Sequence, residues 1–262
     1  MRPFFCQIAL CGSTRFRIVW LLTIGILLAP GNGWAGSWRV IPIRLDFNKK
    51  THSGVVSIAN DDTVPLTVRV EADQWLQGDE GKDRYIKSDD LIFFPQVLTV
   101  GPKEERVVRV GIKTPAIKTE KTYRLFISED PSARKPQGTG VAIAIRFGVP
   151  IFVEPLQKEP QGEIQGLALE QGKAHFSVAN TGNVHFRIKT VKATGFDTES
   201  RPLFSKDLSA WYVLAGVSRQ YDLEIPQESC LQLHTLSVEV TSDDRAPLNQ
   251  QINVDQAACL RK

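Results

Sequence analysis

Residues 140–153 read Gly-Val-Ala-Ile-Ala-Ile-Arg-Phe-Gly-Val-Pro-Ile-Phe-Val. Successive side chains of an extended strand point to opposite faces, so Val141, Ile143 and Ile145 share one face and the alanines between them share the other. Branched apolar residues at every second position favour a strand over a helix. We therefore expect one long apolar strand over 141–153. At an exposed sheet edge, such a strand invites pairing with another chain.

The same period of two continues on both sides of this stretch. Short alternating runs are separated by clusters of Gly, Pro, Asn and Asp, which mark turns. The candidate strands are 55–58, 66–70, 97–100, 106–110 and 123–127 before it, and 164–169, 174–179, 185–192, 211–214, 221–225, 235–240 and 251–254 after it. Strands of this length and spacing predict an all-β fold of the sandwich type.

The segment from Phe93 to Val110 contains two of these runs on either side of Gly101-Pro102-Lys103. Gly followed by Pro marks a tight connection. We therefore expect a β-hairpin at this position.

Residues 154–162, Glu-Pro-Leu-Gln-Lys-Glu-Pro-Gln-Gly, interrupt the pattern with polar side chains and two prolines. Segments of this composition commonly connect domains. We therefore expect two β-sandwiches, over residues 36–155 and 156–262, each of an ordinary size for one domain.

The first 35 residues have the organisation of a secretory signal peptide. Three arginines precede an apolar core over 18–28, and Gly33-Trp34-Ala35 offers small residues at both positions that signal peptidase reads. We expect cleavage after Ala35; the alternative is a retained membrane anchor, for which the apolar stretch is short. Residues 1–35 contain no Asp or Glu, so the remaining chain carries 29 basic and 29 acidic side chains. This balance gives no general attraction to nucleic acid or anionic lipid.

Two cysteines remain after such a cleavage, Cys230 and Cys259. Outside the cytoplasm, two cysteines in one chain usually pair. Neither lies in a Cys-x-x-Cys pair or beside a histidine, which disfavours a metal site or a nucleophile. We expect a structural disulfide between them.

The residues that catalysis requires form no recognisable motif. His175 and His185 lie on neighbouring predicted strands and are the best candidates for a metal pair, but two strand histidines facing solvent are the simpler interpretation. Gly138-Thr139-Gly140 leads into a strand, whereas a phosphate loop leads into a helix. We therefore expect no enzymatic activity, no metal and no cofactor.

An ordered series of segments resembles the periplasmic chaperones that assemble bacterial pili. The series consists of Val40–Phe47 with its arginine, Pro95–Val110 with its Leu-x-x-Gly-Pro and Val-Arg-Val runs, Tyr123-Arg124-Leu125, the strand over 141–153, Val178–His185 and Trp211–Gly216. The resemblance covers nearly all of the chain after the leader. It implies two immunoglobulin-like domains set at an angle in an L shape, and a periplasmic location.

The resemblance also implies a mechanism and partners. Chaperones of this family hold pilus or fimbrial subunits, whose own fold lacks a strand, by donor-strand complementation, and deliver them to an outer-membrane usher. Val141, Ile143 and Ile145 match the side chains that fill the groove of the subunit. The implied partners are therefore pilus subunits and the usher, with no nucleic acid and no membrane insertion after cleavage.

The chain departs from the family pattern where the terminal carboxylate of the subunit is held. Typical members use an Arg on the first strand, which Arg44 matches, and a Lys near the end of the donor strand, where this chain has Pro150. Arg124 and Arg146 are the nearest replacements, since a guanidinium pairs a carboxylate through two hydrogen bonds. The Arg-x-Gly-Val-Pro pattern that begins at Arg146 resembles divergent branches of the family. We expect a non-standard chaperone with a shifted anchor.

A secreted structural or adhesive protein is the alternative. A pilin-like subunit would be a single domain with an N-terminal donor peptide, and a sugar-binding sandwich would expose aromatic residues. Trp38, Trp75 and Trp211 are instead spaced like core residues. The chaperone is therefore the favoured interpretation.

Overall fold

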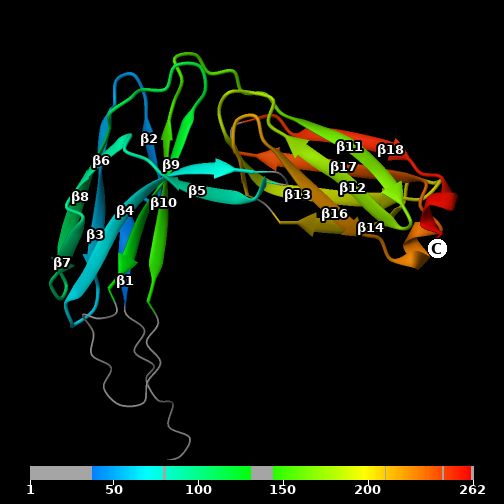
Figure 1. Cartoon of the computed structure of the whole chain (residues 1–262). Coiled ribbons are helices and arrows are strands. Elements are labelled where there is room, and N and C mark those ends of the chain that lie inside the picture. Colours follow the sequence, from blue (N-terminus) through cyan, green and yellow to red (C-terminus); the bar gives the residue numbers. More distant parts are fainter. Residues whose placement is uncertain (1–36, 79–80, 131–143, 210, 244, 261–262) are drawn as a thin grey trace, which may run out of the picture. The chain divides into compact units, whose positions relative to one another are not determined.

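The computed structural model describes residues 37–78, 81–130, 144–209, 211–243 and 245–260. The expected leader lies outside these ranges, as do Val141 and Ile143. The described residues form an all-β protein whose strands belong to two sandwiches, one from β1 to β10 and one from β11 to β18 (Figure 1). The predicted fold class is confirmed.

The first sandwich contains two sheets. One has the order β1-β3-β8-β6, with bounds Trp38–Ile41, Ser53–Asn60, Glu105–Ile112 and Leu91–Phe94. The other has the order β2-β10-β9-β4-β5, with bounds Leu45–Phe47, Arg146–Val153, Lys121–Glu129, Leu66–Gln77 and Asp83–Lys87, and β7 (Val97–Val100) pairs with β4 beside this path. The alternation expected from the sequence holds the sheets together, because Val108 and Val110 of β8 and alternate side chains of β4 from Leu66 to Ala72 are buried in the core between them.

The N-terminal strand segment crosses from one sheet to the other. β1 pairs with β3 in an antiparallel manner, and β2 runs parallel to β10 over Leu45–Phe47. Pro42 separates the two strands and follows a cis peptide bond. As a result, the segment borders both sheets of the sandwich and covers only the end of β10.

The hairpin expected over 93–110 is wrong. β7 pairs with β4, while β8 pairs with β3 and β6, so the Gly101-Pro102-Lys103 turn connects strands of different sheets. The same turn residues occur in hairpins and in connections between two sheets, so they do not specify which strands pair. The strands that pair with β7 and β8 are not adjacent to them in the sequence. The run Phe93–Val110 therefore supplies strands to both sheets.

The second sandwich also contains two sheets. One has the order β11-β12-β16, with bounds Glu163–Glu170, Lys173–Ala179 and Ser218–Glu224. The other has the order β14-β13-β17-β18, with bounds Pro202–Leu208, Phe186–Phe196, Thr235–Ser242 and Leu248–Asn253, and β15 (Tyr212–Val213) pairs with β13. The sequence pattern missed β14, whose side chains are mostly exposed or half-buried and carry little apolar alternation.

The predicted disulfide is confirmed. Cys230 ends the short helix α2 (Gln227–Cys230), and Cys259 ends the 3₁₀ helix η3 (Gln256–Cys259). The two residues are bonded with their Cα atoms 5.6 Å apart, and both are buried in the second core. The bridge therefore ties the end of the described chain to the core of its own sandwich.

Candidate functional site

β10 has an open edge over its first half. On one side it pairs with β9 along its whole length, and on the other side it pairs only with β2, over Ile151–Val153. No further strand of the described chain pairs with β10, so the backbone of Arg146–Pro150 lacks a neighbouring strand on that side. Unpaired N–H and C=O groups of an edge are a template for an added strand.

The side chains of this edge alternate between the core and the outer face. Ile145, Phe147 and Val149 pack on the core of the first sandwich, where Phe147 meets Trp38 edge-on with 4.6 Å between ring centres. β10 begins at Arg146, later than expected, and Ile145 precedes it as a partly buried residue. The groove-filling roles of Val141, Ile143 and Ile145 stay a prediction.

Two arginines flank Pro150, one on β9 and the other directly before β2. Arg124 of β9 lies opposite Pro150. Arg44 immediately precedes Leu45, which lies opposite Ile151. The register therefore places Arg44, Pro150 and Arg124 in one row across the sheet. Pro150, where the resemblance had implied a lysine, is thus bordered by two arginines.

Arg44 is half-buried and already has one carboxylate partner. Its Nε and Nη2 donate to the Asp46 carboxylate at 2.7–2.9 Å, and its guanidinium lies 4.9 Å from the centre of the Phe152 ring. Burial by itself lowers the pKa of Arg44, but the hydrogen bonds and charge of Asp46 outweigh burial and raise it. A second carboxylate at Arg44 would share the guanidinium with Asp46.

Arg124 is buried and has spare donors. Its Nη1 donates to the Gly148 carbonyl at 2.9 Å, while its Nε and Nη2 have no hydrogen-bond partner. Its guanidinium stacks 3.9 Å from the centre of the Trp75 ring. Burial lowers the pKa of Arg124, and the nearby Tyr85 and Asp83 oppose that effect. Buried N–H groups without partners are rare in folded proteins.

Arg146 lies apart from this row. It is exposed, and its guanidinium lies 3.8 Å from the centre of the Phe126 ring, which in turn meets Tyr85 edge-on. Of the three predicted anchor residues, the structure therefore brings together Arg44 and Arg124 beside the linked rings of Phe152 and Trp75, whose centres are 6.0 Å apart.

Sequence reasoning missed a set of contacts that connects these rings to the second sandwich. Trp75 and Phe152 form a buried cluster with Leu214, and Tyr212 packs against it. The Gln77 side chain donates to the Tyr212 carbonyl at 3.0 Å and accepts from the Leu214 N–H at 2.9 Å. No motif predicts these residues, because the two hydrogen bonds of the Gln77 side chain join positions 135 and 137 residues apart.

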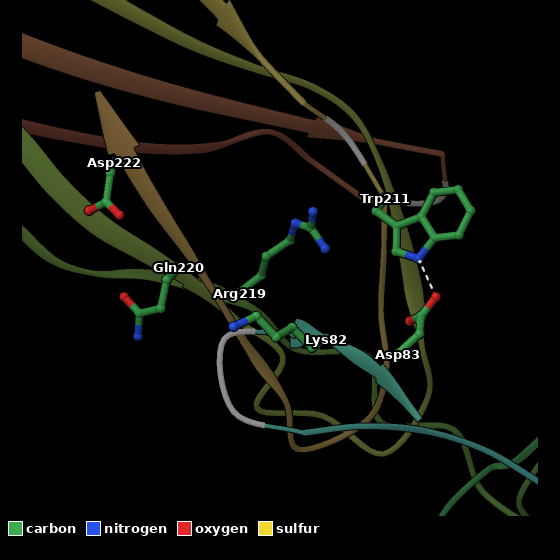
Figure 2. A pocket seen from close by; sticks show the side chains of 7 residues that line it. Lys82, Asp83, Trp211, Arg219, Gln220 and Asp222 are labelled. Carbon is green, nitrogen blue, oxygen red and sulfur yellow. Dashed lines mark hydrogen bonds between the residues drawn. The ribbon is translucent and has the colours of Figure 1, made fainter. Parts of the chain in front are cut away.

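Asp83 is the second missed residue of this region. Its carboxylate accepts hydrogen bonds from the indole of Trp75 at 2.9 Å, from Gln77 at 3.1 Å and from the indole of Trp211 at 3.2 Å. Trp211 is 40% exposed, so its predicted place in the core is wrong. It borders a hollow with Lys82, Asp83, Arg219, Gln220 and Asp222, shown in Figure 2. Its indole therefore serves a polar contact at the surface.

Of the two histidines, His175 faces solvent as expected, whereas His185 does not. His175 lies 2.5 Å from Asp222 on the neighbouring strand β16. The His185 side chain is 9% exposed, bonds Glu120 through Nδ1 at 2.7 Å and stacks on Phe152 with 3.5 Å between ring centres. Among the described residues, no three side chains of His, Cys, Asp or Glu lie close enough to hold a metal ion. The same residues include no helix that is both long and apolar enough to span a bilayer.

Comparisons with known proteins identify a related family. Residues 38–158 match a family model described as "Pili and flagellar-assembly chaperone, PapD N-terminal domain". No curated protein matches the sequence.

Several solved structures share the fold. A structure of the YadV chaperone matches with a TM-score of 0.55 at 12% identity, over 83% of this chain and 99% of that one. The class 5 fimbriae chaperone CfaA matches with a TM-score of 0.53 at 13% identity, over 84% and 100%. The CsuC–CsuE complex of chaperone and tip adhesion subunit, from archaic chaperone-usher Csu pili of Acinetobacter baumannii, matches with a TM-score of 0.52 at 15% identity, over 71% and 89%. At these identities the likeness establishes the fold alone.

Proposed function

Because the chain belongs, through residues 38–158, to the family of pili and flagellar-assembly chaperones, we propose that it binds pilus subunits by adding a strand to their incomplete fold. It keeps them soluble in the periplasm and delivers them to an outer-membrane usher. The proposal needs neither an enzymatic step nor a cofactor. The CsuC–CsuE structure, a chaperone–subunit complex with the same fold, supports this type of partner.

The open edge at Arg146–Pro150 is the observation that carries the proposal. A guest strand that pairs there receives main-chain hydrogen bonds from β10. In this proposal the alternate apolar side chains Val141, Ile143 and Ile145, which precede β10 in the sequence, enter the groove of the subunit. Each apolar side chain that becomes fully buried contributes about 1.5–3 kcal/mol.

The register of β2 supports Arg44 and Arg124 as the anchor. A guest strand parallel to β10 lies in line with β2 and ends where β2 begins, at Leu45. Its terminal carboxylate then lies in the row of Arg44, Pro150 and Arg124. Arg124 has two donors to spare, and Arg44 adds positive charge. Arg146 lies beside an earlier part of the guest strand.

Co-purification from the periplasm tests the proposal. The full chain is co-expressed with each neighbouring small secreted protein, as wild type and as Ile143→Asp and Ile145→Asp. We expect a soluble one-to-one complex that both substitutions abolish. Ile117→Asp is the matched control, because Ile117 is 64% exposed in the loop between β8 and β9 and is not part of the open edge of β10.

Circular dichroism confirms that each variant is folded, which matters for Ile145 because it is partly buried. Retention of the subunit by folded Ile143→Asp and Ile145→Asp would contradict strand addition. If no partner is ever retained, the adhesive alternative becomes the better explanation.

A further inference from the structure

One outer face of the first sandwich is apolar. On the sheet β1-β3-β8-β6, five large apolar side chains point outward with exposed fractions from 41% to 74%: Ile41, Val55, Ile92, Phe94 and Val107. The register makes them neighbours. Ile41 and Val107 lie in the same row through Ser57, and Val55 and Phe94 lie in the next row on either side of Arg109.

In the second sandwich, the outer face of the sheet β14-β13-β17-β18 is polar on β17 and β18. On β17 the outward residues are Ser237, Glu239 and Thr241, and on β18 they include Asn249 and Gln251. A sandwich of this type therefore does not require an apolar outer face. Contiguous exposed apolar residues mark an interaction surface.

The central strand of the apolar face carries a symmetrical arrangement of charge. The outward residues of β8 are Glu105, Val107 and Arg109, since Val108 and Val110 are buried. Within the described ranges, neither Glu105 nor Arg109 has an ion-pair partner. One acidic and one basic side chain thus lie at equal distances on either side of Val107.

We propose that this face binds the same face of a second copy of the chain. The proposed two-fold axis lies between the two facing sheets and runs over Val107, perpendicular to β8. It therefore reverses the strand direction in the partner. It places Glu105 of one copy opposite Arg109 of the other, twice. In the row between these two pairs, Ile41 and Val107 face their own copies, while Val55 and Phe94 lie beside Arg109. Packed sheets lie about 10 Å apart, a distance that facing Glu and Arg side chains can span.

The size of the face predicts a weak dimer. Four strands spaced about 4.8 Å apart, over the few rows involved, cover on the order of 400 Å². A stable interface buries about 800 Å² on each partner. Association through this face is therefore reversible and depends on concentration. It differs from pairing at the edge of β10 and does not depend on the proposed function.

Sedimentation velocity of the mature chain, from micromolar to near-millimolar concentration, tests the proposal. We expect a monomer–dimer equilibrium in the wild type. Arg109→Glu and Glu105→Arg each place like charges opposite one another and raise the dissociation constant by at least about tenfold, or 1.4 kcal/mol. The double variant Glu105→Arg/Arg109→Glu restores the opposite charges and the wild-type constant.

Two controls separate this face from other surfaces. Glu239→Arg makes the same change on the outer face of β17 and leaves the constant unchanged. Ile145→Asp, beside the open edge of β10, also leaves it unchanged. The proposal is overturned if the wild type stays monomeric throughout, if the double variant is not rescued, or if Ile145→Asp abolishes the dimer, because association then uses the strand edge.

Discussion

The guanidinium of Arg124 lies between the ring of Trp75, at 3.9 Å from the ring centre, and the carbonyl of Gly148, at 2.9 Å from Nη1. Trp75 is fully buried, and Gly148 lies on the open edge of β10. One side chain therefore connects the core of the molecule to the strand that we propose receives the guest. Its planar shape and its donors both matter to that connection.

We predict that Arg124→Lys weakens both stability and subunit binding. An ammonium keeps the charge but loses the stacking and the second donor direction, which costs about 0.5–2 kcal/mol of folding free energy. Urea denaturation measures the loss of stability, and co-purification measures subunit retention. Arg106→Lys is the control, since Arg106 is exposed and pairs only with Glu104. Unchanged retention in folded Arg124→Lys would remove Arg124 from the anchor.

We predict that Asp83→Ala destabilises the protein by about 1–3 kcal/mol, because the buried indole N–H of Trp75 loses its acceptor. Trp211 and Gln77 lose an acceptor in the same variant. Denaturation monitored by tryptophan fluorescence provides the measurement. Asp89→Ala, at an exposed turn position nearby, is the control and changes little. Equal stabilities of the two variants would show that the Asp83 contacts contribute nothing.

We predict that removal of the disulfide costs about 3–4 kcal/mol in the chain-entropy model, given its separation of 29 residues. Cys230→Ser/Cys259→Ser and reduction of the wild type give the same loss in denaturant titrations. Because both cysteines pack in the second core, the second sandwich loses its structure first. A difference of less than 1 kcal/mol between oxidised and reduced protein would contradict the entropic account.

We predict a pH-dependent contribution from Asp90. The hydrogen bond from Tyr123 at 2.6 Å and that from Lys121 at 3.1 Å hold the pKa of the Asp90 carboxyl below its ordinary value. A carboxyl group whose pKa is lowered in the folded protein contributes its full stabilisation at pH values above its pKa in the unfolded chain, which is about 3.9. The contribution is lost as the pH falls through the pKa of the folded protein. Asp90→Asn should therefore lose stability at neutral pH and approach the wild type in acid.

The same hydrogen bond acts in the opposite direction at high pH. Burial first, and then the bond to Asp90, raise the pKa of the Tyr123 hydroxyl. The stabilisation by the Tyr123 hydroxyl is present at pH values below the pKa of tyrosine in the unfolded chain, which is about 10, and it is lost as the pH rises further. Denaturation of wild type and Tyr123→Phe across pH measures it. If the two proteins differ by the same amount at neutral and alkaline pH, the hydroxyl does not contribute in this way.

The sequence predicted the features that depend on local alternation or on covalent chemistry. The strands over 66–70, 106–110 and 123–127 lie within β4, β8 and β9, and the disulfide forms as expected. The connection at Gly101 could not be assigned to one sheet, because a turn residue does not specify the partner of the strand that follows. β14 was missed because half-exposed strands have little apolar alternation.

The candidate site was predictable in part, for a related reason. Arg44 and Arg124 were named from segments that resemble a family, and their shared row with Pro150 follows from pairing between strands far apart in sequence. Asp83 and Gln77 were not named as functional residues, because their partners lie 6 to 137 positions away and form no spacing that a motif could encode.

The short strand β2 has a consequence for the length of any guest. Because β2 occupies the edge of β10 from Ile151 onward, a guest strand parallel to β10 cannot slide past Leu45. A shift of one residue would also turn its apolar side chains to the opposite face. In the proposed strand addition, the end of β2 defines the register from the carboxyl end of the guest, and we expect subunits to be selected by the spacing of apolar residues counted back from their last residue.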